Sequence, residues 1–308
     1  MNSILIGRSS LSASRLAYGC WRVAETEEAG RTLGRAAIIA AYETGYTLFD
    51  HADIYCAGRA ESAFGAVLKE VSGMRERVVI ATKCGIRMAG DPAPGAPFRY
   101  DFSADHIRRS CEGSLKRLGV DCIDLYQLHR PDWLCDPAEV AGVFSELRQA
   151  GKARAFGVSN FAPAQVTVLQ KACPMPLVVN QVEISLAKLD CFTDGTLDQC
   201  VAENITPMAW SPLGGGLLAD GPRRLLPWQE EYRPAMAVET LDAIATSRGA
   251  SRSVVALAWL LKHPGGIVPI VGSTNPERIR EATKAAELEL SREEWYTLLE
   301  AARGERLP

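Results

Sequence analysis

The sequence lacks the features that mark several large classes of protein. None of its apolar runs approaches the ~20 residues that cross a bilayer, and the run in the first ten residues is too short for the apolar core of a signal peptide. We therefore expect a cytoplasmic protein with no membrane partner. Its 34 Lys and Arg and 37 Asp and Glu are mixed along the chain and give a net charge of −3. Since no basic stripe is present, we expect no nucleic acid partner.

Motifs for metals, disulfides and the usual dinucleotide fold are also missing. The four histidines are isolated, without HxH or HExxH spacing, so we predict no metal centre. The nine cysteines are an odd number with no CxxC pair, which favours reduced thiols, including Cys20 and Cys84 near predicted strand ends. No GxGxxG follows the first strand, which disfavours a Rossmann site.

What the sequence does contain is a regular alternation of strand-like and helix-like segments. Helix starts are marked by Ser103, by Asn275 before Pro276, and by Ser291 with Glu294 in a capping box. Alternation with short connections implies parallel strands and right-handed crossovers. Eight such units close into a (β/α)8 TIM barrel, here a single domain over residues 1–308, with a short N-terminal β piece and extra C-terminal helices. A doubly wound open sheet is the alternative. The expected barrel strands are 15–20, 47–49, 78–82, 123–128, 155–158, 177–182, 206–211 and 267–271.

One stretch interrupts the alternation. Residues 85–100 are rich in glycine and proline and show no periodicity. We expect a long functional loop there rather than a linker.

Four titratable residues stand at or just beyond the ends of three successive strands. Asp50 ends the second expected strand and Tyr55 follows in its loop, while Lys83 and His129 end the third and fourth. Any one of them could have an ordinary role in a turn, in packing or at the surface. Because barrel enzymes carry their chemistry at the carboxyl ends of the strands, we expect all four in one pocket.

These four side chains are suited to protonating a carbonyl oxygen. A phenol has a pKa near ~10, and lowering it by ~2–3 units requires roughly 3–4 kcal/mol. A lysine cation about 4 Å away supplies on the order of 4 kcal/mol at an effective dielectric of ~20. We therefore predict that Lys83, kept charged by Asp50, lowers the pKa of Tyr55, and that His129 orients the substrate. No side chain donates a hydride, so the reaction requires a reduced cofactor.

Seven stretches together resemble the aldo-keto reductase superfamily, most closely its bacterial YdhF-type oxidoreductases. The stretches are FDHADIY, IATKCG, DLYQLHRP, FGVSNF, NQVE, AWSPLGGG and PIVGSTNPERI, in this order along nearly the whole chain. The resemblance implies an oxidoreductase that reduces an aldehyde or ketone to the alcohol, reversibly, with NADPH extended over the barrel opening. It also implies a catalytic tetrad of Asp50, Tyr55, Lys83 and His129, with Tyr55 as the general acid.

The same resemblance assigns cofactor-binding roles. Ser159, Asn160 and Gln181 match positions that hold the nicotinamide carboxamide, and Trp210 matches the aromatic residue that stacks on the ring. The predicted pyrophosphate loop contains Ser211, Leu213, Gly215 and Gly216, and the predicted 2′-phosphate site contains Gly272, Ser273, Thr274 and Arg278; Gly19 and Trp21 complete the cofactor site. The chain has Cys56 where many members of the family have Gly. It has Gly272 where several members have Lys. NADP(H) is expected in preference to NAD(H).

Two other functions are compatible with a barrel of this kind. One is a cofactor-sensing or interaction subunit, as in the potassium-channel β-subunits that share the fold. The other is a metal-dependent hydrolase, which the lack of paired histidines disfavours. We expect the reductase, acting as a monomer on small or medium carbonyl compounds, with Trp21, Trp133 and Trp228 as aromatic pocket walls.

Overall fold

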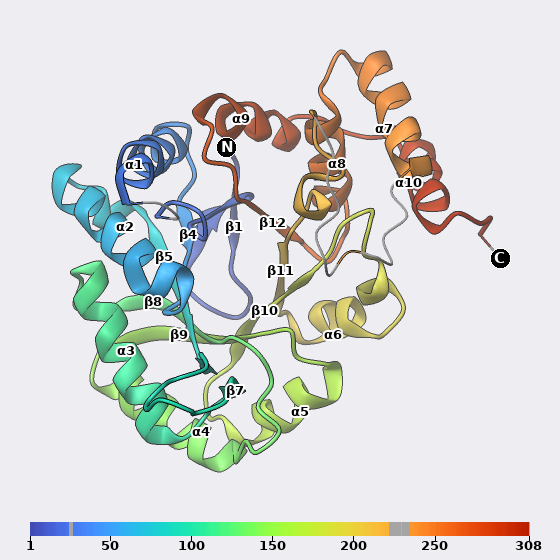
Figure 1. Cartoon of the computed structure of the whole chain (residues 1–308). Coiled ribbons are helices and arrows are strands. Elements are labelled where there is room, and N and C mark those ends of the chain that lie inside the picture. Colours follow the sequence, from blue (N-terminus) through green and yellow to red (C-terminus); the bar gives the residue numbers. More distant parts are fainter. Residues whose placement is uncertain (25–26, 222–228, 230–234, 308) are drawn as a thin grey trace.

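Eight parallel strands form a closed ring at the centre of the molecule, and helices surround it (Figure 1). The computed structural model describes residues 1–24, 27–221, 229 and 235–307. Hydrogen-bonded neighbours follow in the order β3-β4-β5-β8-β9-β10-β11-β12, and β12 pairs with β3 to close the ring. The predicted barrel is confirmed, and the open-sheet alternative is wrong. The barrel strands are β3 (Ala17–Gly19), β4 (Leu48–Asp50), β5 (Val79–Cys84), β8 (Ile123–Leu128), β9 (Ala153–Ser159), β10 (Leu177–Glu183), β11 (Thr206–Trp210) and β12 (Val268–Val271).

Every connection between successive barrel strands carries at least one helix, and the sequence marks several helix starts. The Ser103 hydroxyl accepts from the His106 backbone N–H at the start of α3, and Ser291 and Glu294 form the predicted capping box at α10. The α-helices are α1 (Glu27–Glu43), α2 (Arg59–Glu70), α3 (Ala104–Leu118), α4 (Pro137–Gln149), α5 (Pro163–Ala172), α6 (Thr196–Glu203), α7 (Ala235–Arg248), α8 (Arg252–Leu261), α9 (Pro276–Ala282) and α10 (Arg292–Arg303). The short 3₁₀ helices are η1 (Tyr55–Gly58), η2 (Arg75–Arg77), η3 (Asp190–Phe192), η4 (Gly214–Gly216) and η5 (Thr283–Ala286).

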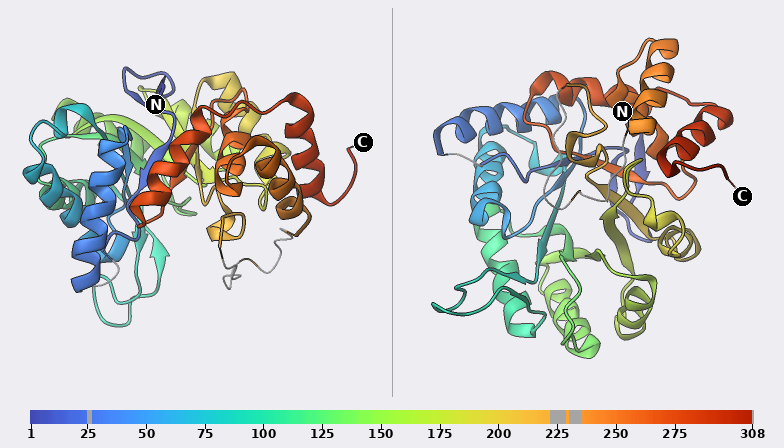
Figure 2. Two further views of the ribbon diagram at one scale, coloured as in Figure 1. Left: turned by 90° about the horizontal axis from the view of Figure 1, so that it is seen from above. Right: turned by 45° about the vertical axis from the view of Figure 1, so that its right-hand side comes forward.

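An N-terminal hairpin closes the amino end of the barrel. Strands β1 (Ser3–Leu5) and β2 (Ser12–Ser14) pair antiparallel, and Ile6 between them is fully buried in the apolar cluster inside the ring. The Gly7 backbone N–H donates to Thr206 Oγ1 over 2.8 Å, at the first residue of β11. The hairpin lies at one end of the barrel (Figure 2). We call the opposite end, at the carboxyl ends of the strands, the mouth.

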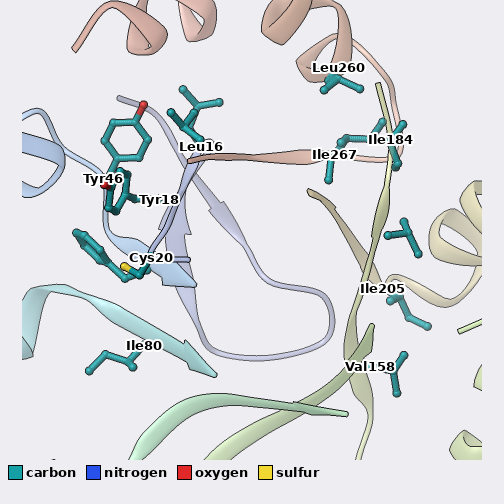
Figure 3. Packing of buried hydrophobic residues seen from close by; sticks show 14 of the residues in the cluster. Leu16, Tyr18, Cys20, Tyr46, Ile80, Val158, Ile184, Ile205, Leu260 and Ile267 are labelled. Atoms are coloured by element: carbon teal, nitrogen blue, oxygen red, sulfur yellow. The ribbon is translucent and has the colours of Figure 1, made fainter. Parts of the chain in front are cut away.

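Two apolar cores lie on the two faces of the barrel sheet. One fills the ring, and the other lies between the strands and the surrounding helices, where Tyr18 and Tyr46 pack edge to face with their ring centroids 6.2 Å apart (Figure 3). Along β4, Leu48 belongs to the inner core and Phe49 to the outer one. Because strand side chains alternate between faces, Asp50 points inward again, one layer above Leu48.

The stretch predicted as a long loop, residues 85–100, has no helix or strand between residues 88 and 98, but two short strands that the sequence did not indicate lie at its ends. Strands β6 (Ile86–Arg87) and β7 (Arg99–Tyr100) form a two-stranded antiparallel hairpin beyond the end of β5. The buried Arg87 side chain stabilises the hairpin, because its guanidinium donates to Asp91 Oδ2 over 2.5 Å and to Asp101 Oδ2 over 2.8 Å. Strands of two residues are too short to produce a periodic signal in the sequence.

Candidate active site

The four residues of the predicted tetrad come together at the mouth. Lys83 Nζ donates to Asp50 Oδ1 over 2.7 Å, to Asp50 Oδ2 over 2.8 Å and to the His51 carbonyl over 2.7 Å. The same nitrogen lies 5.0 Å from the centroid of the Tyr55 ring. The rings of Tyr55 and His129 meet edge to face, with centroids 5.8 Å apart. The ends of β4, β5 and β8 thus place all four side chains in one cluster.

Backbone conformation directs Tyr55 into this cluster. Tyr55 begins η1, where Cys56 and Ala57 both adopt positive φ, at 52° and 54°. Such left-handed conformations are uncommon for residues with a Cβ and favour glycine. Cys56 here adopts the conformation that the tight turn requires, and its Sγ donates to the Trp21 carbonyl over 3.1 Å.

The electrostatics differ from the sequence prediction at Tyr55. Burial raises the pKa of this phenol, and the Lys83 charge and hydrogen bond offset only part of that effect, so the net direction is upward. The predicted lowering of this pKa is therefore wrong, because the cost of burying the phenolate charge exceeds the attraction of the lysine. Tyr55 is therefore a neutral phenol that holds its proton.

The other titratable groups have clear charge states. Burial lowers the pKa of Lys83, but the attraction of Asp50 and Tyr55 outweighs it, and the net shift is upward. Lys83 is therefore a cation paired with the Asp50 carboxylate. Burial, followed by the charges of Lys83 and Arg130, moves the pKa of His129 well below its ordinary value, so the imidazole is neutral.

Asn160 bonds to two other residues predicted to lie around the nicotinamide, Ser159 and Trp210, and to the backbone of His129 in the tetrad. Its Nδ2 donates to Ser159 Oγ over 2.8 Å and to the His129 carbonyl over 3.3 Å, and its Oδ1 accepts from Trp210 Nε1 over 2.9 Å. Asn160 adopts a φ of 61°, a left-handed conformation that asparagine tolerates better than most residues. These bonds fix the Trp210 ring relative to the His129 segment.

Gln181 joins this group to the carboxylate of Asp50. The Gln181 carbonyl accepts from Ser159 Oγ over 2.8 Å, and its side-chain Nε2 donates to Asp50 Oδ1 over 2.8 Å. Gln181 and Ser159 are both buried. The residues predicted for the carboxamide therefore lie next to one another and in direct contact with the tetrad.

The residues predicted to bind phosphates follow the two adjacent strands β11 and β12. Gly215 and Gly216 have positive φ, at 66° and 105°, in η4. A Cβ built at Gly216 or Gly272 would meet no atom of the described residues within 4 Å, so both backbones are open on that side. Ser211, with a φ of 49°, and Leu213 precede η4, while Ser273 and Thr274 lead from β12 to α9, whose first turn contains Arg278.

The first barrel strand contributes Gly19 and Trp21. A Cβ at Gly19 would lie 2.8 Å from Ile270 Cγ2, so only glycine fits there without displacement of that side chain. The Trp21 ring lies 6.4 Å from the Tyr55 ring and is 47% exposed. Trp133 is 87% exposed and has no described contact with the tetrad, and Trp228 lies outside the described residues.

The sequence interpretation missed Arg130. Its Cζ lies 5.5 Å from the centroid of the Trp210 ring, in a cation–π contact across the mouth. The only available signal was a charged residue directly after His129 in the stretch LHRP.

The described residues form no second site with a comparable set of catalytic side chains. A cavity of about 710 Å³ lies behind the Tyr55 segment, lined by residues such as Asp53, Arg87 and His106, but no tetrad residue lines it. Within the described ranges, no cluster of three His, Cys, Asp or Glu side chains could hold a metal ion, and no helix is long and apolar enough to span a membrane. All nine cysteines are free, and burial raises the pKa of Cys20 and Cys84 well above its ordinary value, so these thiols stay protonated.

A closed (β/α)8 barrel with a Lys–Asp pair, a phenol and an imidazole at its mouth defines a class of barrel oxidoreductases. The family model described as the Aldo/keto reductase family matches residues 15–303, and the chain belongs to this family, which generally uses nicotinamide cofactors.

Individual relatives agree with this assignment over nearly their full lengths. A 6-dehydroglucose reductase from Novosphingobium aromaticivorans is 44% identical over 98% of this chain and 96% of its own. Oxidoreductase YdhF from Escherichia coli is 41% identical over 96% of this chain and 95% of its own. The crystal structure of the thermostable aldo-keto reductase Tm1743 with the inhibitor epalrestat matches with a TM-score of 0.83 at 29% identity, covering 98% of this chain and 100% of that one.

Proposed function

We propose that this protein reduces an aldehyde or ketone to the alcohol with NADPH, reversibly, and that Tyr55 is the general acid. The observation that carries the proposal is the bonding of Lys83, whose ammonium group is held by Asp50 while it lies over the Tyr55 ring. A phenol beside a fixed cation gives up its proton more readily once negative charge develops on a substrate oxygen. In the reverse direction the same cation stabilises the phenolate, which then serves as the base.

The chain's own groups fit a bound nicotinamide cofactor, which would supply the hydride. Asn160 and Gln181 present amide groups that match a carboxamide in donors and acceptors. The open backbones at Gly216 and Gly272 permit close approach of a phosphate. We propose Arg278, in the first turn of α9, as the residue for a 2′-phosphate, and therefore NADP(H) as the cofactor.

His129 completes the proton-transfer group. The imidazole is neutral and buried, and its Nδ1 has no hydrogen-bond partner among the described residues. A neutral imidazole donates one hydrogen bond without competing with Tyr55 for the acidic role. We propose that it orients the substrate oxygen toward the phenol.

For the substrate, we propose a small or medium carbonyl compound, with sugar aldehydes as the first class to test. The relative from N. aromaticivorans is named for a sugar carbonyl compound, and it shares 44% of its residues over nearly the whole chain. Trp21 lies beside Tyr55 with its ring half exposed, where it would contact a substrate placed against the phenol.

The test begins with equilibrium titration of the purified protein with NADPH and with NADH, followed by a panel of sugar and simple aldehydes and ketones. We expect tighter binding of NADPH than of NADH and turnover of at least one carbonyl class. NADPH binding without turnover would favour the sensing subunit instead, and binding of neither cofactor would refute the proposal.

The role of Tyr55 is tested by Tyr55→Phe. Loss of a positioned general acid lowers kcat by roughly 10²–10⁴-fold. We expect a loss in this range with the dissociation constant for NADPH unchanged within about twofold, measured by steady-state kinetics and fluorescence titration. An active Tyr55→Phe variant would remove Tyr55 from the acid role.

A further inference from the structure

Arg130 occupies a position in the mouth that the proton-transfer chemistry does not require. It follows His129 at the end of β8, half-buried, yet its guanidinium lies 5.5 Å from the ring of Trp210 on β11. Strands β9 and β10 separate β8 from β11 in the ring, so the side chain extends across the part of the mouth that contains Asn160. Asn160 accepts from Trp210 Nε1 and donates to the His129 carbonyl. These two bonds fix the Trp210 ring relative to the backbone that precedes Arg130.

The charge on Arg130 is not balanced within the described part of the site. Lys83 and Asp50 form a pair and cancel each other at a distance. No carboxylate of the described residues lies within ion-pair distance of Arg130, and Glu183, the register neighbour of Trp210, has interactions of its own. His129 is neutral. Arg130 therefore gives the Trp210 side of the mouth a positive charge.

We propose that Arg130 makes the site discriminate between the oxidation states of the nicotinamide cofactor, by weakening the binding of NADP⁺ relative to NADPH. This inference rests on the proposed function, in which the nicotinamide lies against Trp210. The oxidised ring carries a positive charge and the reduced ring carries none, while the rest of the cofactor is the same. A fixed cation beside the ring therefore penalises only the oxidised form.

The cation–π contact between Arg130 and Trp210 also weakens the binding of NADP⁺ relative to NADPH. The face of a tryptophan attracts cations, and an unoccupied Trp210 would stabilise the oxidised ring more than the reduced one. Arg130 already uses this attraction, so a second cation at the same indole gains less from it. The two effects together favour binding of the reduced cofactor and release of the oxidised one, and thus bias the enzyme toward carbonyl reduction.

The test compares dissociation constants of NADPH and NADP⁺ for the wild-type protein, Arg130→Met and the matched control Arg130→Lys, by isothermal titration calorimetry. Methionine removes the charge and keeps much of the apolar stem, whereas lysine keeps the charge. We expect the ratio of the NADP⁺ constant to the NADPH constant to fall on the order of tenfold in Arg130→Met, mainly through tighter NADP⁺ binding. In Arg130→Lys the ratio should stay within about threefold of wild type, since lysine also binds aromatic faces as a cation.

Salt provides a second readout that a purely structural role would not change. Raising the ionic strength weakens the phosphate contacts of both cofactors equally, so those contacts cancel in the ratio, while the charge effect of Arg130 on the ratio decreases. We expect the wild-type ratio to shrink with salt and the Arg130→Met ratio to stay constant.

The possible outcomes separate the inference from the proposed function. A ratio unchanged in Arg130→Met, or an equal loss of affinity for both cofactors, would overturn the inference and leave the reductase proposal intact. Failure of the wild-type protein to bind either cofactor would overturn the proposed function itself. If Arg130→Met does not fold, as judged by circular dichroism, Arg130→Gln makes the same comparison.

Discussion

The Asp50–Lys83 pair is a costly arrangement of single residues, because both charges are buried. Lys83 is fully buried and Asp50 is 3% exposed, so two charges have been removed from water. The structure compensates by giving the ammonium three acceptors and by adding the Gln181 amide as a further donor to Asp50. Such a pair contributes little net stability but tolerates the loss of one partner poorly.

We therefore predict that Lys83→Met destabilises the protein by about 3–5 kcal/mol, because Asp50 is left as a buried, uncompensated charge. The measurement is the free energy of unfolding in urea. The double variant Asp50→Leu, Lys83→Met, which removes both charges, should recover a large part of this loss while remaining inactive. If the single and double variants are equally stable, the two charges are not coupled as described.

His51 gives a pH-dependent prediction. It is fully buried against Phe64, with ring centroids 4.6 Å apart, and neither ring nitrogen has a partner in the described structure. Burial, with a smaller effect of the Lys83 charge, lowers the pKa of His51 to about 3. Between this value and the ordinary one near 6.5, only the unfolded chain takes up the proton. The contribution of His51 to stability is therefore complete above pH 6.5 and decreases as the pH falls below it.

From this linkage, His51→Leu should flatten the acid side of the stability profile. At pH 5, about 1.5 pH units below the ordinary pKa, wild type loses roughly 2 kcal/mol through this group, and the variant does not. Urea unfolding at pH 7.5 and pH 5.0 measures both values. An equal drop in wild type and variant would show that His51 is solvated or bonded in the folded state.

The sequence predicts the place of a residue in the site when a local pattern marks it. It does not predict a contact between residues that are distant in the sequence. Asp50, Lys83 and His129 are visible because each ends an apolar run, and the barrel rule then places them together. The contact of Arg130, just beyond β8, with Trp210 on the non-adjacent β11 joins residues eighty positions apart, and no periodicity indicates it. The raised pKa of Tyr55 was missed because burial is a property of the folded state.

At the scale of elements, local signals predicted the structure well where one residue type is strongly preferred. Ser103, Ser291 and Glu294 all form the caps expected of them. The β6–β7 hairpin was missed because it depends on side-chain pairs of Arg87. Close contacts between helices are equally hidden, since they depend on small residues whose partners lie elsewhere in the chain.

Gly65 in α2 provides a test of one such contact. A Cβ at Gly65 would lie 2.6 Å from the Leu118 carbonyl oxygen at the end of α3, so that alanine requires the two helix backbones to separate. A Cβ built at Gly142 in α4 would have no atom of the described residues within 4 Å, so Gly142 serves as the matched control. We predict that Gly65→Ala destabilises by about 1–3 kcal/mol through overpacking, while Gly142→Ala stabilises by about 0.5–1 kcal/mol. Thermal and urea unfolding would measure both, and a Gly65→Ala variant at least as stable as wild type would contradict the close packing.

At the scale of the whole molecule, ring closure couples the two halves of the chain. The first barrel strand pairs with the last, with Ala17 opposite Ile270, and the N-terminal hairpin contacts the start of β11. Neither half can therefore complete its core alone. The alternation of segments predicted this architecture because eight parallel units close in only a few ways.

We accordingly predict that the protein unfolds in one cooperative transition, with a calorimetric enthalpy close to the van't Hoff value, as a single domain over residues 1–308. Two resolved calorimetric transitions would contradict this prediction.

We also predict a monomer, with a mass of 33.4 kDa by light scattering. The reason is that the exposed large apolar side chains of the described residues are spread over separate elements, such as Leu5 on β1, Val168 on α5 and Met236 on α7. A mass near twice the monomer value, lost on replacing the exposed pair Trp133 and Leu134 with serine, would instead place an interface on the β8–α4 loop.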